Sequence, residues 1–313
     1  MPDIEQVKAI VRGPMLPVIT SFHDDLSLDT DTIQDNVRYL VDGGLVRGKG
    51  AMLAVGAGGD FPMLSTEERK RVAEAVVEAA GGQATVFIGV QHTHPAVCRE
   101  LAEHAQAIGA DGIQASPTYY YEPSDADVLA FFQMLSDAVS MPIMVYNTPW
   151  LVGYDLSFEM LDALADMEQV MALKWACDNV HVFLRAIELF AGRLAIVDNL
   201  GLTVMAHMMG ATGWITHLAN IWPEHEVALW EQMDAGDYVG AQAEFQRVNW
   251  RWLDFRGKMA RLTGGEANVI KAAYGLVGRR GGKVRPPTRD MSPEHRAELK
   301  ALLQEIGVPG VLA

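Results

Sequence analysis

Eight short apolar segments recur along residues 15–217, and this repetition constrains the fold more than any other feature of the chain. Between them lie segments with the spacing of amphipathic helices, such as residues 66–80, where Ser65 and Glu68 form a capping-box signature. A strand followed by a helix, repeated eight times, is typical of a parallel sheet that closes into a (β/α)8 barrel, the TIM barrel. The predicted strands cover residues 15–20, 51–56, 85–90, 111–116, 141–147, 170–175, 194–199 and 212–217.

The strand pattern stops after Glu224. Residues 225–313 have helical periodicity, interrupted by a basic, glycine-rich stretch at 278–287. A (β/α)8 barrel takes roughly 250 residues, so this chain has room for one barrel and an appendage. We therefore predict an α/β fold with the barrel in residues 1–224 and an α-helical region in residues 225–313.

The charge and the cysteines narrow the functional classes. A formal net charge of −15 opposes binding to nucleic acids and to anionic membranes, which attract basic surfaces. The two cysteines, Cys98 and Cys177, lack CxxC spacing, so neither a zinc cluster nor a disulfide scaffold is indicated, and both are expected in the core. The N-terminus lacks the apolar segment of a signal peptide, and no apolar run is long enough to span a bilayer. A cytoplasmic protein is predicted.

Polar side chains that could react are concentrated where the predicted strands end. In (β/α)8 barrels the chemistry takes place at the C-terminal ends of the strands and in the loops that follow. Lys174, Tyr146 and Asp198 lie at those ends of the sixth, fifth and seventh strands. The loops at residues 56–60 and 116–123 follow the second and fourth strands. We expect these five regions to line one active site.

Lys174 interrupts the apolar segment VMALKW, between Leu173 and Trp175. An unpaired ammonium is costly to bury, so the side chain pairs with a carboxylate, reaches water, or becomes a neutral amine. A neutral amine condenses with a ketone to an iminium, and a nearby phenol such as that of Tyr146 can relay the protons involved. The alternatives are an ion-paired lysine and a half-buried tyrosine without a catalytic role.

The glycine-rich turn GAGGD at residues 56–60 has two interpretations. The segment FPML separates it from the helix cap at Ser65, which disfavours a phosphate site because phosphate loops lead directly into a helix. Its backbone amides can instead form a nest for a carboxylate. The alternative is a tight turn without a ligand.

His92 and His94 are candidates for a metal site, since two imidazoles one residue apart can share an ion. With Lys174, His217 and Asp198 they would resemble the binuclear site of metal-dependent amidohydrolase barrels. Those barrels carry the histidine pair after the first strand, whereas here it follows the third. We therefore favour a solvated loop, and predict neither a metal ion nor a cofactor.

Seven motifs in consistent order resemble those of the dihydrodipicolinate synthase and N-acetylneuraminate lyase superfamily of Schiff-base aldolases and dehydratases. The similarity runs from about Gly13 to the C-terminus. Each motif is modest alone, but the set is specific. The motifs are LPVITSF, GAGGD with LSTEER, SPTYYYEPS, YNTP, LKWA, GATGWITHLANIWPE, and the tail NVIKAAYGLVG with GGKVRPP.

The resemblance implies a role for each matching residue. Lys174 is expected to form an iminium with pyruvate or another 2-oxo acid, and Tyr146 to relay protons. Ile215 is expected to line the pocket, and Tyr119 or Tyr120 to reach the site of a neighbouring subunit in a homotetramer built as a dimer of dimers. The substrate's carboxylate is expected to be held by the backbone of the turn, at Gly56, Ala57 and Gly58.

Departures from the family pattern concern the turn and the outer pocket. Ala57 and Gly58 stand where the family usually has hydroxyl residues of a proton relay, and Asp60 replaces the usual glutamate. Leu151 occupies the position at which true dihydrodipicolinate synthases bind a second carboxylate with arginine. Three tryptophans, Trp150, Trp175 and Trp214, are candidates for an apolar surface in the outer pocket, and the alternative for each is a place in the core of the helix layer.

These features predict a lyase, either an aldolase or a dehydratase, that acts on a 2-oxo acid through a lysine Schiff base, with an aldehyde as a second partner. Dihydrodipicolinate synthase itself is disfavoured by Leu151. Two alternatives stay open: a non-catalytic or regulatory member of the same family, and a metal-dependent hydrolase of the amidohydrolase type. The retained Lys174 and Tyr146 favour the lyase.

Overall fold

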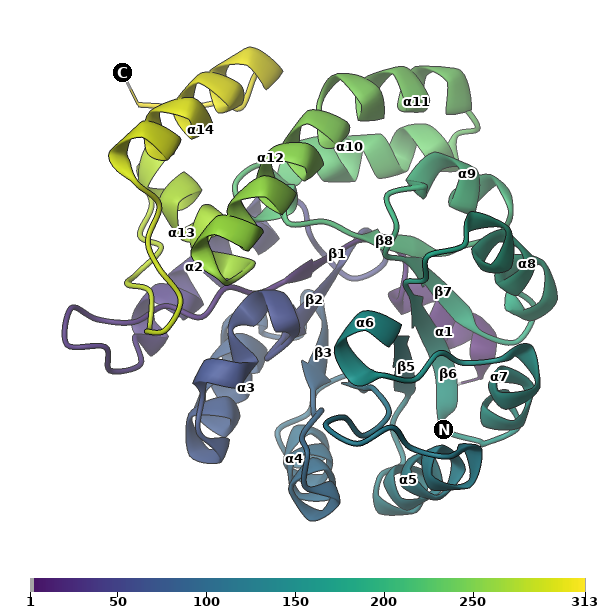
Figure 1. Ribbon diagram of the computed structural model, residues 1–313. Coiled ribbons are helices and arrows are strands. Elements are labelled where there is room, and N and C mark those ends of the chain that lie inside the picture. The colour runs from purple at the N-terminus through teal and green to yellow at the C-terminus, as the bar shows by residue number, and fades with distance from the viewer. Residues whose placement is uncertain (1–2, 313) are drawn as a thin grey trace. The chain divides into compact units, whose positions relative to one another are not determined.

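The computed structural model describes residues 3–312 and contains the predicted barrel (Figure 1). Eight parallel strands form a closed barrel in chain order, and each overlaps one predicted segment, which confirms the fold class. The strands are β1 (Gly13–Pro17), β2 (Ala51–Ala54), β3 (Thr85–Gly89), β4 (Gly112–Ala115), β5 (Ile143–Asn147), β6 (Val170–Trp175), β7 (Ala195–Asp198) and β8 (Gly213–Ile215).

Helices alternate with the strands, because parallel neighbours need a crossover connection. The predicted cap is confirmed at one of them, where Ser65 and Glu68 exchange side-chain and backbone hydrogen bonds. The helices up to β8 are α1 (Ile4–Ile10), α2 (Thr30–Asp42), α3 (Thr66–Ala80), α4 (Pro95–Ala107), α5 (Asp125–Ala138), α6 (Pro149–Val152), α7 (Phe158–Ala165), α8 (Val180–Phe190) and α9 (Thr203–Met208), with the 3-10 turns η1 (Ala57–Gly59) and η2 (Phe61–Met63).

Helices alone follow the last strand, as the sequence predicted. They are the 3-10 turn η3 (Leu218–Asn220) and the helices α10 (Pro223–Asp234), α11 (Tyr238–Arg247), α12 (Asn249–Thr263), α13 (Ala267–Leu276) and α14 (Pro293–Ile306). The described chain divides into two compact units. The first comprises the chain up to Met15, Arg47–Ala51 and Thr85–Ile215, and the second comprises Leu16–Val46, Met52–Ala84 and the chain from Thr216. The boundary at residue 224 stays a prediction.

The first unit contains strands β3 to β8 with helices α4, α5, α7 and α8 on their outer side (Figure 1). Strands β3, β4, β5 and β7 are buried at every position, as expected for parallel strands covered on both faces. Cys98 and Cys177 are buried, which confirms the expectation that both lie in the core.

The second unit has its own core, built largely from α12, α13 and α14. Trp252 and Tyr274 are its largest buried side chains, and the tail after α14 adds Val308. This packing explains why the C-terminal helices are amphipathic although they follow no strand. Within residues 3–312, no helix combines the length and the apolar composition that a membrane span requires.

Candidate active site

The pairing of β5 with β6 brings Tyr146 and Lys174 side by side. They are register partners, so both side chains leave the same face of the sheet. The Nζ of Lys174 lies 3.9 Å from the centre of the Tyr146 ring. Both residues are buried, with 5% of Lys174 and 7% of Tyr146 exposed. The structure therefore joins the two residues that the sequence analysis paired, at the C-terminal ends of neighbouring strands.

A buried apolar residue adjoins this pair on the next strand. Val197 on β7 is the register partner of Lys174 and shares its face, whereas Leu173 and Trp175, fully buried on β6, face the opposite side. An ammonium over an aromatic ring gains a cation–π attraction of about 2 kcal/mol when it is desolvated. Lysines that act as nucleophiles are found in such apolar surroundings. The arrangement can hold an amine next to a phenol while excluding most water.

Asn199 extends the pair and was missed by the sequence analysis. Its Nδ2 donates a hydrogen bond of 3.4 Å to the phenol oxygen of Tyr146. Asn199 directly follows Asp198, so its place at the end of β7 was readable from the sequence. An asparagine there has no distinctive chemistry until its partner is known. The structure supplies that partner.

Trp175 and Trp214 lie on the opposite face from Lys174. Trp175 follows Lys174 on β6, and strand side chains alternate between the two faces. Trp214 shares the face of Trp175, because both are register partners of Asp198 on β7. Of the two placements that the sequence left open, the register therefore favours the core for both tryptophans.

Asp198 also points away from the face of Lys174, and holds the turn that leads into α9. Its carboxylate accepts hydrogen bonds from the backbone N of Leu200 and from Oγ1 of Thr203. Burial raises its pKa to about 6, although these hydrogen bonds act in the opposite direction. Its role in this structure is to shape the loop that presents Asn199.

The glycine-rich turn, residues 56–60, belongs to the second unit and forms one turn of 3-10 helix. The amides of Gly59 and Asp60 donate to the carbonyls of Gly56 and Ala57. The amides of Ala57 and Gly58 come first in this helix and have no acceptor within the turn. They are the backbone donors that a carboxylate nest would use.

Backbone strain precedes this turn. Val55 has a φ of 58°, in the left-handed region that β-branched residues rarely enter. Such a conformation costs about 1–3 kcal/mol and is found most often at functional sites. The strained residue lies between the end of β2 and Gly56. It therefore sets the direction in which the turn leaves the strand.

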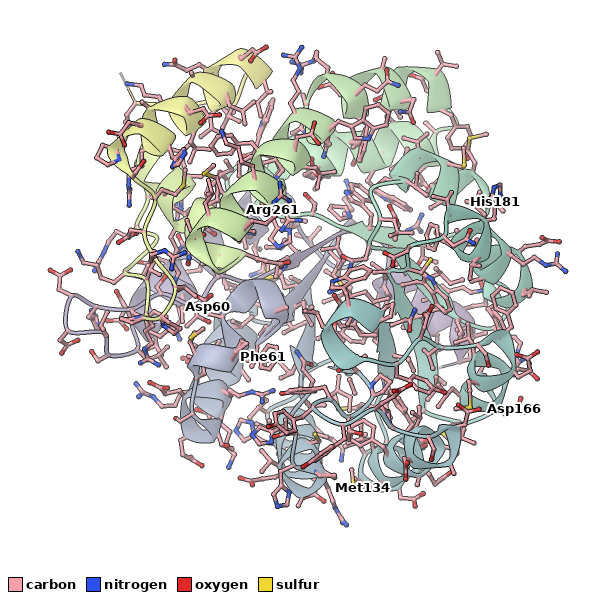
Figure 2. The ribbon with its side chains drawn as sticks, viewed as in Figure 1. Asp60, Phe61, Met134, Asp166, His181 and Arg261 are labelled. Carbon is pink, nitrogen blue, oxygen red and sulfur yellow. The ribbon has the colours of Figure 1, made fainter. Side chains whose placement is uncertain are left out.

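A buried ion pair fixes the other end of the turn. Asp60, labelled in Figure 2, accepts a 2.7 Å hydrogen bond from Nζ of Lys271 on α13. Thr20 Oγ1 donates to the carbonyl of Gly59 at 2.6 Å. Burial lowers the pKa of Lys271, and the nearby Asp60 opposes that shift. Asp60 therefore has a structural role in holding the turn to α13.

The loop after β4 carries the candidate tyrosines. Tyr120 has a φ of 90° and is 85% exposed, whereas Tyr119 is half-buried. The ring of Tyr121 packs edge-on against that of Tyr120, with centroids 5.3 Å apart. Of the two candidates, Tyr120 combines exposure with backbone strain. That combination fits a side chain held outward for contact with another molecule.

Ile215 and Leu151 occupy different surroundings. Ile215 ends β8 on the face of Gly213, which is the register partner of Val197 and so shares the face of Lys174. Leu151 lies on α6, directly after β5, with Trp150 beside it; they are 57% and 56% exposed. Thus α6 presents an apolar surface at the end of the strand that carries Tyr146.

The histidines of the metal hypothesis have structural partners. His94 caps α4, since its Nδ1 accepts from the backbone N of Ala96 at 3.2 Å. His92 Nδ1 accepts from the backbone N of His94 at 2.9 Å. Among residues 3–312 no group of three or more metal-ligating side chains comes together. These contacts account for both imidazoles as parts of a helix start.

A (β/α)8 barrel with a buried lysine and tyrosine at the ends of adjacent strands is the arrangement expected of a Schiff-base lyase. The comparisons with known proteins point to the same class of protein. Residues 11–306 match the model of the Dihydrodipicolinate synthetase family, and the chain belongs to that family. Members of this family include Schiff-base lyases, and its relatives carry the names of lyases and synthases.

Three relatives place the chain within the family. An uncharacterized DapA-like lyase of Halobacterium salinarum is 32% identical over 95% of each chain. YagE of Escherichia coli K12, which carries the name of a 2-dehydro-3-deoxy-D-gluconate aldolase, is 31% identical over 95% of this chain and 98% of its own. A 4-hydroxy-tetrahydrodipicolinate synthase of Methanothrix thermoacetophila is 30% identical over 94% of this chain and 97% of its own.

The crystal structure of YagE, solved in complex with pyruvate, superimposes with a TM-score of 0.86. In that comparison the sequences are 29% identical, and 95% of this chain and 99% of YagE are covered. A relative with this fold therefore binds pyruvate.

Proposed function

We propose that this protein is a lyase that acts on pyruvate or a related 2-oxo acid through a Schiff base on Lys174. The observation that supports it most is the buried amine of Lys174, 3.9 Å from the ring of Tyr146 at the ends of two neighbouring strands. The family and the pyruvate complex of YagE agree with it. No cofactor or metal ion enters this mechanism.

The chemistry begins with attack of the neutral amine of Lys174 on the keto carbon. Loss of water from the resulting carbinolamine gives the iminium, which draws electrons away from the adjacent carbon. A bond at that carbon then breaks, or a new bond forms, through the enamine. Tyr146 moves the protons on the reacting oxygens, and the hydrogen bond from Asn199 orients its phenol.

The substrate's carboxylate is assigned to the amides of the glycine-rich turn, at Gly56, Ala57 and Gly58, with Ile215 as an apolar wall. Carboxylates bind well to such backbone donors because the amides need no reorganisation when the ligand arrives. Tyr120, exposed and strained, is assigned to a neighbouring subunit's site in a homotetramer. Light scattering tests this assembly, and a fully active monomer would remove that role for Tyr120.

The second partner is assigned as an apolar or aromatic aldehyde. Leu151 and Trp150 expose apolar area on α6, where an arginine would have bound a second carboxylate. With the 2-oxo acid fixed, kcat/KM is expected to be higher for apolar aldehydes than for aspartate semialdehyde. A preference for aspartate semialdehyde or for sugar acids would contradict this assignment.

Borohydride trapping tests the Schiff base. Incubation with pyruvate and borohydride is expected to add one reduced adduct, and peptide mapping should place it on Lys174. The variant Lys174→Ala should lose the adduct, and the half-exposed Lys258→Ala is the matched control that should keep it. No adduct with any 2-oxo acid tried would favour a non-catalytic barrel. Loss of turnover on chelation would favour the hydrolase.

A further inference from the structure

Strands β5 and β6 do not pair in one continuous register. Ile143 at the start of β5 is the partner of Val170, but the next residue of β5, Met144, is the partner of Ala172. The pairing therefore passes over Met171, and β6 carries one more residue than β5 at this point. Irregularities of this kind turn the side chains that follow them and are over-represented next to active sites.

The shift decides which side chain stands opposite Tyr146. Continued from the start of the pair, the first register would place Leu173 opposite Tyr146 and Lys174 opposite the next residue of β5. Register partners share a face and neighbours on one strand alternate, so the amine and the phenol would then lie on opposite faces. In the observed register Lys174 is the partner of Tyr146. Their meeting therefore depends on a shift of one residue.

The side chain of Asn147 joins β5 to β6 just beyond the shifted register. Asn147 is fully buried and directly follows Tyr146. Its Nδ2 donates to the carbonyl oxygen of Ala176 at 3.1 Å, and the backbone N of Ala176 donates to the carbonyl oxygen of Asn147 at 3.0 Å. In the unshifted register Ala176 would lie one residue, about 3.3 Å, further along the strand, beyond the reach of this amide. The side-chain bond is therefore specific for the register in which Lys174 faces Tyr146.

The loop that follows α6 fixes the orientation of this amide. Nδ2 of Asn147 also donates to Oδ1 of Asp155 at 2.8 Å, and Oδ1 of Asn147 accepts from the backbone N of Leu156 at 3.1 Å. Both donor hydrogens of the amide and its acceptor oxygen are thus engaged. Helix α6 lies between Asn147 and this loop in the chain, at the end of β5 (Figure 1). The loop therefore holds the amide with one donor directed at β6.

We propose that Asn147 is a positioning residue whose amide locks the register in which Lys174 faces Tyr146. This role rests on the proposed function, because the amine and the phenol concerned are those of the Schiff-base reaction. Asn147 acts on them through the backbone of β5 and β6 and has no contact with substrate. An amide suits the role because it carries two donors and an acceptor, whereas an ionised carboxylate only accepts.

Asn147→Asp is the main variant, since it keeps the shape and the acceptor but loses both donors when ionised. The rate of adduct formation with saturating pyruvate is measured by cyanoborohydride trapping and expressed per folded molecule, with the folded fraction taken from circular dichroism. Above the pKa of the introduced carboxyl we expect this rate to fall about 100-fold, the loss that a misplacement of about 1 Å can cause.

The pH dependence separates positioning from a purely structural role. As the pH falls, the introduced carboxyl gains a proton and can donate one hydrogen bond again. The ratio of the variant's rate to that of the unmodified enzyme should therefore rise at acidic pH. A purely structural amide would change the free energy of unfolding and leave this ratio, per folded molecule, close to one at every pH.

A second variant and a matched control complete the experiment. Asp155→Ala removes an exposed partner of the amide and leaves the bond to Ala176, so trapping should slow only about threefold. Asn268→Asp is the control, because Asn268 is also buried and its Nδ2 donates to the carbonyls of Thr263 and Arg289. It should lose stability but trap pyruvate at the unmodified rate at every pH.

The outcomes separate this role from the proposed function. If the unmodified enzyme traps pyruvate and Asn147→Asp matches its rate at every pH, or Asn268→Asp slows as much, the positioning role falls and the proposed function stands. If the unmodified enzyme forms no adduct with any 2-oxo acid, the proposed function falls and the positioning role falls with it. Should Asn147→Asp fail to fold, an unchanged trapping rate in Asp155→Ala overturns the inference.

Discussion

Lys174 and Lys271 are the two buried lysines among residues 3–312, and their surroundings differ in one decisive respect. Both amines lie over an aromatic ring, at 3.9 Å from the centroid of Tyr146 and at 4.7 Å from that of Phe22. Lys271 also donates to the carboxylate of Asp60 at 2.7 Å and to the carbonyl of Lys283 at 3.0 Å. Lys174 faces a phenol whose oxygen is held by Asn199.

The two lysines share burial and differ in the group that each amine faces. A carboxylate partner keeps an amine protonated and engaged, so that Lys271 serves to hold the turn at residues 56–60. A phenol beside the amine adds a group that can donate or accept a proton. The partner, more than the exposed fraction, distinguishes the two lysines.

The largest expected effect follows from replacing the lysine that faces the phenol. Lys174→Met keeps most of the side-chain volume, so the fold should persist while the nucleophile is lost. We expect kcat/KM to fall at least about 1000-fold, which corresponds to about 4 kcal/mol of transition-state stabilisation. Steady-state kinetics and trapping by borohydride measure this. Labelling of Lys271 in its place would overturn the distinction between the two lysines.

Lys271→Met should instead act on stability, since it leaves the carboxylate of Asp60 buried without its partner. Breaking a buried pair typically costs about 3–5 kcal/mol. Urea unfolding is the measurement, with Lys271→Met/Asp60→Asn as the paired variant that should regain most of the loss. Equal stability of the single variant and the unmodified protein would show that this pair does not anchor the turn.

A smaller effect is expected at the phenol. Asn199→Leu removes a donor to Tyr146, worth about 1 kcal/mol, so kcat should fall about fivefold. The alkaline limb of the pH profile should move to higher pH, because the phenolate loses a hydrogen bond that stabilises it. Asn199→Asp, which is close in shape but lacks the amide donor, should shift the limb in the same direction. An unchanged profile in both variants would limit Asn199 to packing.

The smallest effect concerns acid stability near Lys271. Arg285, which also stacks on Phe22, lowers the pKa of Glu68 to about 2 by hydrogen bonding. The pair stabilises the fold above the unfolded pKa of 4.5, and this contribution is lost as pH falls toward 2, because the unfolded chain binds the proton first. Urea midpoints across this range should fall less in Glu68→Gln than in the exposed Glu67→Gln. Parallel curves would contradict the assignment.

Sequence reasoning succeeded where the relevant pattern was local. The strands of the barrel and the cap at Ser65 follow from spacing over a few residues. Lys174 and Tyr146 were selected because barrel chemistry takes place at the C-terminal ends of the strands. Sequence reasoning left the placement of Trp214 open, because the face of that side chain depends on the register between β7 and β8. Trp175 could have been assigned correctly, since it is adjacent to Lys174 on one strand and must face the other way.

The sequence by itself determined the class of fold and the residue types at the strand ends, because hydrophobic periodicity and chain order are properties of short segments. Only the tertiary structure decided which side chains meet. Asn199 reaches Tyr146 through strand pairing, Lys271 finds Asp60 across a helix packing, and His217 fills the space that Gly58 leaves open. Each contact joins residues distant in the chain, and its distance depends on register and on close packing, which no local pattern specifies.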